Sequence, residues 1–319
     1  MTSPGSDRLD REKFKYSIVI PVYNSEKIVS TTVDRVSEVF TEHGLDHEII
    51  LVNDGSSDGS WDVIAEKART VPNVVALDML KNYGKHHANL AGLREATGDY
   101  VITMDDDLQN PPDQALLLID EAMTGKDLVF GRFERKQAAG YRRIGSSMIS
   151  MINRRIFGQP TDLEVSNYRI LRRDVVDRIC ASQTAHPYIT GQALQYSRRR
   201  SHVTVRHEPR PVGKSNYSMV RILRLVMTIL FSYSSYPLRF AALVGFTISG
   251  LSLLLGAFYL LQGVFGDTHV QGWTTTVVLL SVFNGFTIAL LSMLGEYVVR
   301  TLNAVSAADS YHVTARVPE

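Results

Sequence analysis

Three consecutive aspartates, Asp105, Asp106 and Asp107, follow a short hydrophobic run at Tyr100–Met104, and Gln109 comes two residues after them. Three carboxylates at the tip of a buried strand are unfavourable unless a positive group binds there. A hard divalent cation with oxygen ligands is the simplest such group, and Mg²⁺ commonly binds substrate phosphates at the same time. Because residues i and i+2 of a strand point the same way, we predict that Asp105 and Asp107 share the cation and that Gln109 adds an oxygen. A solvated acidic turn is the alternative interpretation.

Two further segments, Pro21–Glu26 (PVYNSE) and Val52–Asp58 (VNDGSSD), pass from hydrophobic to small and polar residues. Such groups at strand ends can hydrogen-bond a nucleoside, and Gly55 permits a tight backbone turn. For Ser57 and Asp58 a simpler interpretation is favoured, because short polar side chains cap the free N–H groups at a helix start. We therefore expect nucleotide contacts from these two segments, with Ser57 and Asp58 serving the following helix.

The elements that must position these residues alternate along the chain. The hydrophobic patterns predict strands at Tyr16–Val22, His47–Val52, Val74–Leu77 and Tyr100–Met104, and helices at Ser30–Phe40, Trp61–Thr70 and Lys85–Ala96. Strands that alternate with helices indicate an α/β fold with a mostly parallel, doubly wound sheet. Ligands of such sheets bind at the carboxyl ends of the strands, where the polar motifs lie.

Charge and cysteine content exclude several classes of protein. The 319 residues carry 34 Lys and Arg against 33 Asp and Glu, a net charge of +1, which argues against a generic nucleic-acid binder. Cys180 is the single cysteine, so neither an internal disulfide framework nor a cysteine-rich zinc site can form.

The charged residues are distributed unevenly. Residues 238–299 contain only three charged residues, which are Arg239, Asp267 and Glu296. Within this stretch, the apolar runs Phe240–Phe265 and Trp273–Val299 are each long enough to cross a hydrocarbon core of about 30 Å. They predict a transmembrane hairpin whose outer flanks are cytoplasmic, because arginines lie outside the runs and the connecting loop has neither Lys nor Arg. A pair of buried core helices is the alternative.

The sequence thus divides into five parts. We predict a disordered tail (1–15) without a secretion signal, an α/β domain (16–217), an amphipathic juxtamembrane segment (218–237), two transmembrane helices (238–300) and a cytoplasmic C-terminal tail (301–319).

Four motifs in one order, PVYNSE, VNDGSSD, KNYGKHHANLAGL and DDDLQNPP, resemble those of family-2 glycosyltransferases with a GT-A fold. With the C-terminal hairpin, the chain resembles the polyprenyl-phosphate glycosyltransferases. This group includes dolichyl-phosphate mannose synthase, bacterial prenyl-phosphate glucosyltransferases and the undecaprenyl-phosphate aminoarabinose transferase. The likeness extends over about residues 16–300.

The resemblance implies roles for individual residues. It assigns nucleotide binding to Pro21, Tyr23, Glu26, Asp54, Lys81, Asn82, Gly84 and Asp106. It assigns the metal to Asp105, Asp107 and Gln109, and catalysis to Asp105, Asp107 and Arg132. It assigns the acceptor phosphate to Arg132, Arg142, Ser146, Arg169, Arg210 and Lys214. Arg143 with Ser147 is the competing register on the helix that carries Arg142.

The activity implied by the resemblance is inverting transfer of one sugar from a nucleotide-sugar, with UDP favoured, to a polyprenyl phosphate such as undecaprenyl or decaprenyl phosphate. Mg²⁺ or Mn²⁺ is the expected cofactor. The acceptor phosphate is already ionised near neutral pH, its second pKa being about 6, so no general base is required. The expected location is the cytoplasmic face of the inner (plasma) membrane. The resemblance to this family also implies a homo-oligomer.

Two other functions stay open at this point. A processive polysaccharide synthase normally carries a Q-x-x-R-W type motif, and the two tryptophans here, Trp61 and Trp273, lie in other settings. A non-catalytic nucleotide-binding membrane scaffold would not need Asp105, Asp107 and Gln109 together.

Overall fold

The computed structural model describes residues 11–133, 140–182, 184, 186–206, 208, 219–234, 236–237, 240, 243–245, 247, 250–251, 254, 272–306 and 310–318. The chain divides into two compact units, Met1–Ile222 with Ala307–Glu319, and Leu223–Ser306.

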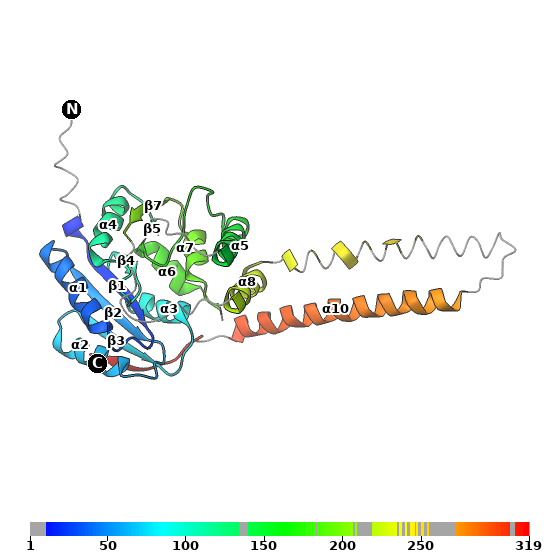
Figure 1. The fold of residues 1–319 in the computed structure, drawn as a ribbon, viewed down its shortest axis with the longest axis horizontal. Coiled ribbons are helices and arrows are strands. Elements are labelled where there is room, and N and C mark those ends of the chain that lie inside the picture. Colours follow the sequence, from blue (N-terminus) through cyan, green and yellow to red (C-terminus); the bar gives the residue numbers. More distant parts are fainter. Residues whose placement is uncertain are drawn as a thin grey trace, which may run out of the picture. The chain divides into compact units, whose positions relative to one another are not determined.

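A mixed sheet forms the centre of the first unit (Figure 1). Among the described residues its strands run in the order β7-β5-β6-β4-β1-β2-β3-β8. Their bounds are β1 Tyr16–Val22, β2 His47–Asn53, β3 Val74–Met79, β4 Tyr100–Thr103, β5 Leu128–Phe133, β6 Arg169–Arg172, β7 Arg200–Val205 and β8 Val313–Val317. The strands β4, β1, β2 and β3 are mutually parallel, as predicted, and β6 is antiparallel to both β4 and β5.

Helices cover both faces of the sheet. They are α1 Val29–Glu42, α2 Ser60–Thr70, α3 Lys85–Glu95, α4 Ala115–Met123, α5 Gly140–Phe157, α6 Arg173–Ala181 and α7 Ile189–Tyr196, with short 3₁₀ turns η2 Arg11–Lys13 and η3 Pro112–Gln114. On one face Ile18 and Ile20 of β1 share a buried cluster with Val33 of α1, Ile64 of α2 and Leu118 of α4. Alternate residues of a strand point to opposite faces, so the residue between them, Val19, faces the other layer.

That other layer includes α3, which packs closely against β1 and β2. A Cβ added at Gly92 of α3 would lie 2.4 Å from Cγ1 of Val19 and 3.2 Å from Cγ2 of Val52. The absent side chain is therefore what lets α3 approach the sheet, and this packing fixes where the first turn of α3 lies. That turn contributes to the site described below.

The N-terminal boundary differs from the prediction. Residues 11–15 were assigned to a disordered tail, but Arg11–Lys13 form η2. Three contacts hold this stretch: Tyr16 Oη donates to the Arg11 carbonyl at 2.9 Å, Arg11 pairs with Asp120 at 3.2 Å, and the Lys15 N–H donates to Asp99 at 2.9 Å. Residues 1–10 lie outside the described part of the chain.

The second unit contains most of α8 (Met219–Tyr233) and all of α10 (Trp273–Ser306). The phenol of Tyr297 donates to the Ser234 carbonyl at 3.2 Å and its ring lies 5.9 Å from that of Phe231. The predicted run Phe240–Phe265 falls mostly outside the described residues, whereas Trp273–Val299 falls within α10. Within the described residues we find no helix with the length and apolarity needed to cross a membrane.

Candidate active site at the carboxyl ends of the central strands

Strand register brings the predicted motifs to one edge of the sheet. Val22 of β1 pairs with Asn53 of β2, and Asn53 pairs with Asp78 of β3. On the other side of β1, Val19 pairs with Thr103, and the Met104 N–H continues the ladder to the Val19 carbonyl at 3.1 Å. The segments that follow β1, β2 and β4 therefore leave the sheet side by side.

The loops after β1 and β2 are bonded to each other. The Asn24 N–H donates to Oγ of Ser56 at 3.0 Å, and the Ser57 N–H donates to Oδ1 of Asn24 at 2.9 Å. The carboxylate of Glu26 accepts the Gly59 N–H at 2.8 Å. Glu26, a predicted nucleotide ligand, thus also fixes the start of α2, while Tyr23 is left exposed at the edge.

The interpretation of Asp58 as a structural residue is confirmed. Its Oδ1 accepts the Ser60 N–H at 3.1 Å at the first turn of α2. Its Oδ2 accepts the Glu26 N–H at 3.2 Å, so the same carboxylate also braces the loop after β1. The N–H and hydroxyl of Ser57 bond to Asn24 instead, which places Ser57 between the loops rather than at the helix cap.

Asp54 holds the segment that precedes α3. Its carboxylate accepts the N–H of Tyr83 at 2.8 Å and the N–H of Gly84 at 3.0 Å, and the side chain is almost completely buried. Burial raises the pKa of Asp54 to about 6, although the two N–H donors favour the charged form and oppose that shift. Lys81 and Asn82 are exposed beside this turn, with Lys81 Nζ 5.3 Å from the centroid of the Tyr83 ring.

In the acidic loop after β4, the three aspartates differ in environment. Asp105 is partly exposed and its Oδ1 forms an ion pair with Nζ of Lys85, the first residue of α3. Asp107 is largely buried and its Oδ1 accepts the Gln109 N–H at 3.1 Å. Gln109 is half-buried, and its own carbonyl accepts the Glu208 N–H at 3.0 Å.

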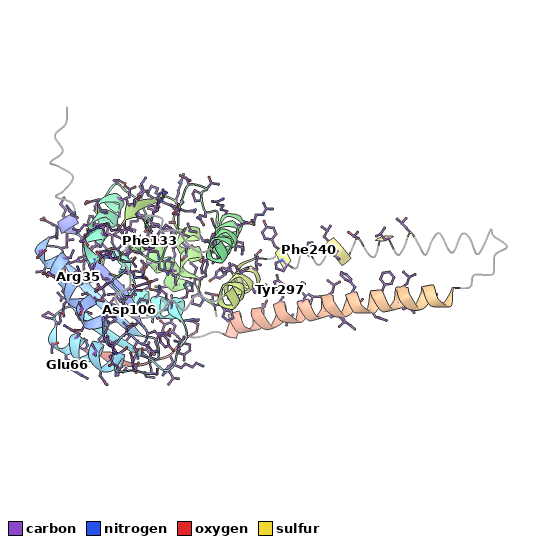
Figure 2. The ribbon with its side chains drawn as sticks, viewed as in Figure 1. Arg35, Glu66, Asp106, Phe133, Phe240 and Tyr297 are labelled. Atoms are coloured by element: carbon purple, nitrogen blue, oxygen red, sulfur yellow. The ribbon has the colours of Figure 1, made fainter. Side chains whose placement is uncertain are left out.

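Asp106, labelled in Figure 2, is largely buried. The Ser25 hydroxyl hydrogen-bonds to its carboxylate, and Thr32 Oγ1 donates to its carbonyl at 2.9 Å. Burial is the main cause that raises its pKa to about 6, and the charges of Asp105 and Asp107 add to the shift. Asp107 is as buried as Asp106, at 6% against 8% exposed, and the three aspartates lie in the loop after the end of β4, so the shared orientation of Asp105 and Asp107 stays a prediction.

The donor set of the acidic loop fits a hard divalent cation. Carboxylate oxygens are the ligands that Mg²⁺ and Mn²⁺ accept, and Asp105 already holds a cationic group, the Lys85 ammonium. No group of three or more His, Cys, Asp or Glu side chains in the described ranges is arranged to hold a metal by itself. A cation held here by Asp105 and Asp107, with Gln109 as predicted, would complete its ligands with water or substrate phosphates, as Mg²⁺ commonly does.

Two of the predicted acceptor arginines are described with their side chains. Arg132, on β5, is partly exposed and its Nε lies 3.5 Å from Oε1 of Glu164. Arg169, the first residue of β6, is 0 % exposed and donates from Nη1 to the Thr190 hydroxyl at 2.8 Å. Its Nε and Nη2 have no hydrogen-bonding partner among the described residues. A direct contact between Arg169 and an acceptor phosphate therefore requires the groups that cover Arg169 to move.

The other four predicted acceptor residues fall partly or wholly outside the described part of the chain. Arg142 and Ser146 lie in α5, which confirms the predicted helix, but their side chains are outside the described part. The choice between that pair and Arg143 with Ser147 stays a prediction. Arg210 and Lys214 lie wholly outside the described residues.

Sequence reasoning missed three residues that shape this site. Lys85 lies in the motif KNYGKHHANLAGL but had no predicted role. The signal that could have identified it is a lysine that directly follows a glycine at the start of a helix, close to the ends of the strands. Glu164 and Thr190 had no such signal, because each meets its arginine only through the tertiary fold.

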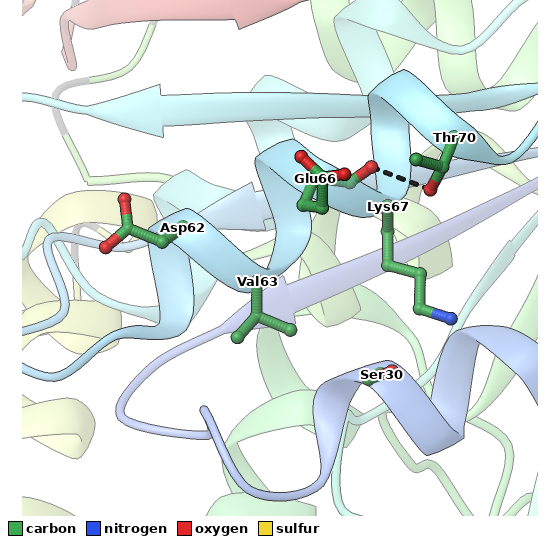
Figure 3. A pocket seen from close by; sticks show the side chains of 6 residues that line it. All are labelled: Ser30, Asp62, Val63, Glu66, Lys67 and Thr70. Atoms are coloured by element: carbon green, nitrogen blue, oxygen red, sulfur yellow. Dashed lines mark hydrogen bonds between the residues drawn. The ribbon is translucent and has the colours of Figure 1, made fainter.

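The hollow drawn in Figure 3 lies elsewhere, between α1 and α2. It measures about 380 Å³ and is lined by Ser30, Asp62, Val63, Glu66, Lys67 and Thr70. None of these is a predicted site residue, and the Lys67–Asp34 ion pair joins α2 to α1. The residues predicted to bind the nucleotide and the metal lie at the strand ends instead.

The site and the sheet agree with a known family. The model described as "Glycosyl transferase family 2" matches residues 17–180, which extend from β1 through most of α6. This chain belongs to glycosyl transferase family 2. It is a glycosyltransferase with an α/β GT-A fold, as the sequence motifs predicted.

Relatives of similar length are found among curated proteins. The chain is 33% identical over 302 residues to the undecaprenyl-phosphate 4-deoxy-4-formamido-L-arabinose transferase of Proteus mirabilis, covering 94% of this chain and 93% of the relative. It is 34% identical over 305 residues to the Yersinia pestis protein of the same name, covering 94% and 92%. The match to this group of transferases confirms the predicted resemblance.

Solved structures share the fold at lower identity. Glucosyl-3-phosphoglycerate synthase from Mycobacterium tuberculosis, in complex with Mn²⁺, UDP-glucose and phosphoglyceric acid, has a TM-score of 0.52 at 15% identity, covering 73% of this chain and 83% of that one. The same enzyme with Mn²⁺, UDP and phosphoglyceric acid has a TM-score of 0.53 at 16% identity, covering 72% and 82%. At these identities the likeness establishes a common fold.

Proposed function

We propose that this glycosyltransferase transfers a single sugar from a UDP-sugar to a polyprenyl phosphate, with inversion at C1 and with a divalent cation. The observation that carries the proposal is the ion pair between Lys85 and Asp105. It joins the acidic loop after β4, proposed to hold the cation, to the turn held by Asp54, proposed to bind the nucleotide. The UDP-sugar is supported by the Mn²⁺ and UDP-glucose bound to the related fold, and the acceptor by the names of the relatives.

The proposed reaction needs no general base from the protein, because the attacking phosphate is already ionised. An oxygen of the acceptor phosphate attacks C1, the bond from C1 to the diphosphate breaks, and the electron pair leaves with the diphosphate. Held by Asp105 and Asp107, Mg²⁺ or Mn²⁺ would supply Lewis-acid stabilisation of that leaving charge. The chain's own task is to bind and orient, and Arg132 is proposed to hold the attacking phosphate after release from Glu164.

We further propose that the second unit anchors the enzyme in the inner membrane, with the catalytic unit on the cytoplasmic face. The low charge of residues 238–299 supports this hairpin. So does the exposure of large apolar side chains in that unit, among them Phe240, Leu254, Ile288 and Val298, each more than 60% exposed. The long lipid tail keeps the acceptor phosphate at the membrane surface, so an enzyme anchored there can bind it.

The test uses the full-length purified chain in detergent with undecaprenyl phosphate, a panel of UDP- and GDP-sugars, and Mg²⁺ or Mn²⁺. Mass spectrometry of the lipid product is the readout. We expect one sugar per lipid, produced with a UDP-sugar and stopped by EDTA. Several sugars per lipid would favour a processive synthase, and nucleotide binding without any product would favour the scaffold.

A variant pair locates the chemistry. Asp107→Ala is expected to reduce metal-dependent transfer by about 100-fold or more, because a carboxylate ligand of the cation is lost. Asp62→Ala, at an exposed aspartate of α2, is the matched control and is expected to keep full activity. Equal turnover in both variants would show that the cation is not bound at Asp107.

A further inference from the structure

Lys85 pairs with the carboxylate of Asp105, which the proposed function assigns to the cation. Its Nζ forms an ion pair with Oδ1 of Asp105, and both side chains are partly exposed, at 37% and 29%. A divalent cation bound to Oδ1 of Asp105 would meet the lysine ammonium at the same oxygen atom. The two positive charges repel each other at one carboxylate, so we expect binding of the cation to displace the Lys85 ammonium.

The backbone of Lys85 cannot leave with its side chain. Lys85 is the first residue of α3, and the preceding Gly84 has φ +93° and donates its N–H to Asp54. Asp54 thus fixes the start of the helix beside the predicted nucleotide segment. The four-carbon stem of a lysine is flexible, so Nζ can swing while its Cα stays in place.

We propose that Lys85 is the counter-ion of Asp105 in the unliganded enzyme and moves to the diphosphate of the nucleotide-sugar when the cation binds. Cation and nucleotide then bind cooperatively, because the diphosphate receives the ammonium that the cation displaces. This inference rests on the proposed function and adds to it a residue that binds the diphosphate of the substrate. Lysine is a common ligand of phosphate as a point charge, which suits both of its positions.

The surroundings of the pair distinguish it from an ordinary surface contact. Asp105 is followed directly by two further aspartates, so Lys85 offsets a concentration of negative charge rather than one isolated carboxylate. Lys67 and Asp34 form a comparable pair at 2.6 Å between α1 and α2, where no acidic cluster lies beside it in the sequence. That second pair provides the matched control.

The test measures Mn²⁺ binding to the full-length protein by electron paramagnetic resonance, with and without UDP, at low ionic strength. In the wild type we expect weak Mn²⁺ binding that UDP strengthens. In Lys85→Met, Mn²⁺ should bind roughly 2- to 5-fold more tightly without UDP, as expected for loss of a partly exposed ion pair, and the gain from UDP should shrink. Lys67→Met should match the wild type, and Lys85→Arg should restore the coupling.

The outcomes separate the two proposals. Unchanged or weaker Mn²⁺ binding by Lys85→Met in the absence of UDP, with a melting temperature like that of the wild type, would overturn the role of Lys85. A wild-type protein that binds neither Mn²⁺ nor UDP would instead overturn the proposed function. Lys85→Gln provides a second uncharged variant, and agreement between it and Lys85→Met shows that the charge is responsible.

Discussion

Gly55 is the residue on which the close approach of two segments predicted to bind the nucleotide depends. It has φ +61°, and a Cβ added there would lie 2.4 Å from the Asn82 nitrogen and 2.4 Å from the Lys81 carbonyl carbon. Those atoms are backbone and cannot rotate away. The turn after β2 therefore contacts the segment before α3 only because this position lacks a side chain.

Gly55→Ala is expected to destabilise the catalytic unit by more than about 2 kcal/mol and to weaken UDP binding, because the segments must separate. Gly44→Ala is the matched control: Gly44 has a similar φ of +64° with nothing within 4 Å of the added Cβ. Backbone strain alone should cost that variant about 1 kcal/mol. Thermal unfolding and calorimetric titration with UDP check both, and equal effects would show that the close contact is unimportant.

Asp106 gives the chain a calculable pH dependence. Its pKa is about 6 in the folded protein against 3.8 as the ordinary value. The folded state therefore retains a proton between those pH values that the unfolded chain has released, and stability from this group falls as the pH rises from about 4 to about 6. At pH 7 the loss is complete and of order 2–3 kcal/mol.

Asp106→Asn removes this titration while keeping the shape of the side chain. We expect the variant to be more stable than the wild type at pH 7, by up to about 2–3 kcal/mol, and to differ little at pH 4. Thermal unfolding in EDTA at the two pH values measures the difference. A constant gap between the two proteins across this range would contradict the buried-acid interpretation.

At the scale of elements, β8 closes one side of the sheet. It pairs antiparallel with β3, Ala76 opposite Val317, and Arg316 forms an ion pair with Glu95 of α3 at 2.6 Å. No strand was predicted in the C-terminal tail. The tail residues alternate between partly buried and exposed, a pattern too short to recognise without knowing that the edge of β3 is open.

Removal of residues 311–319 is expected to expose the edge of β3, since an uncovered strand presents unpaired N–H and C=O groups to other chains. We expect a lower melting temperature and concentration-dependent association, measured by light scattering after size exclusion. Arg316→Gln is the control, because loss of an exposed ion pair alone should cost no more than about 1 kcal/mol. Identical behaviour of the truncated and full-length proteins would mean that β8 does not protect the edge.

At the scale of the whole molecule, the proposed membrane topology predicts which residues reagents can reach. Replacing Cys180 by Ser gives a cysteine-free chain, into which single cysteines are placed at Asp267 in the connecting loop or at Ser3. In intact cells a membrane-impermeant maleimide should label the cysteine at 267 and not the one at 3. Labelling of both, or of neither until the cells are lysed, would reject the hairpin.

The sequence alone determined the α/β class, the strands that end in polar motifs, and the family. These features are local: hydrophobic periodicity identifies strands and helices, and a strand ends where its hydrophobic run ends. Parallel strands bring their carboxyl ends to the same edge of the sheet, so the sequence predicts that the motifs carrying Asp54 and Asp105 lie at that edge.

The tertiary structure decided the contacts between residues far apart in the chain. Lys85 meets Asp105 across 20 residues, Asn24 meets Ser56 across 32, and Arg169 is buried against Thr190 instead of lying open to an acceptor. Such contacts depend on how loops turn and on which helix covers a strand end, and no periodicity within a short window records either. The residue types at this site were therefore readable from the sequence, whereas their partners and exposure were not.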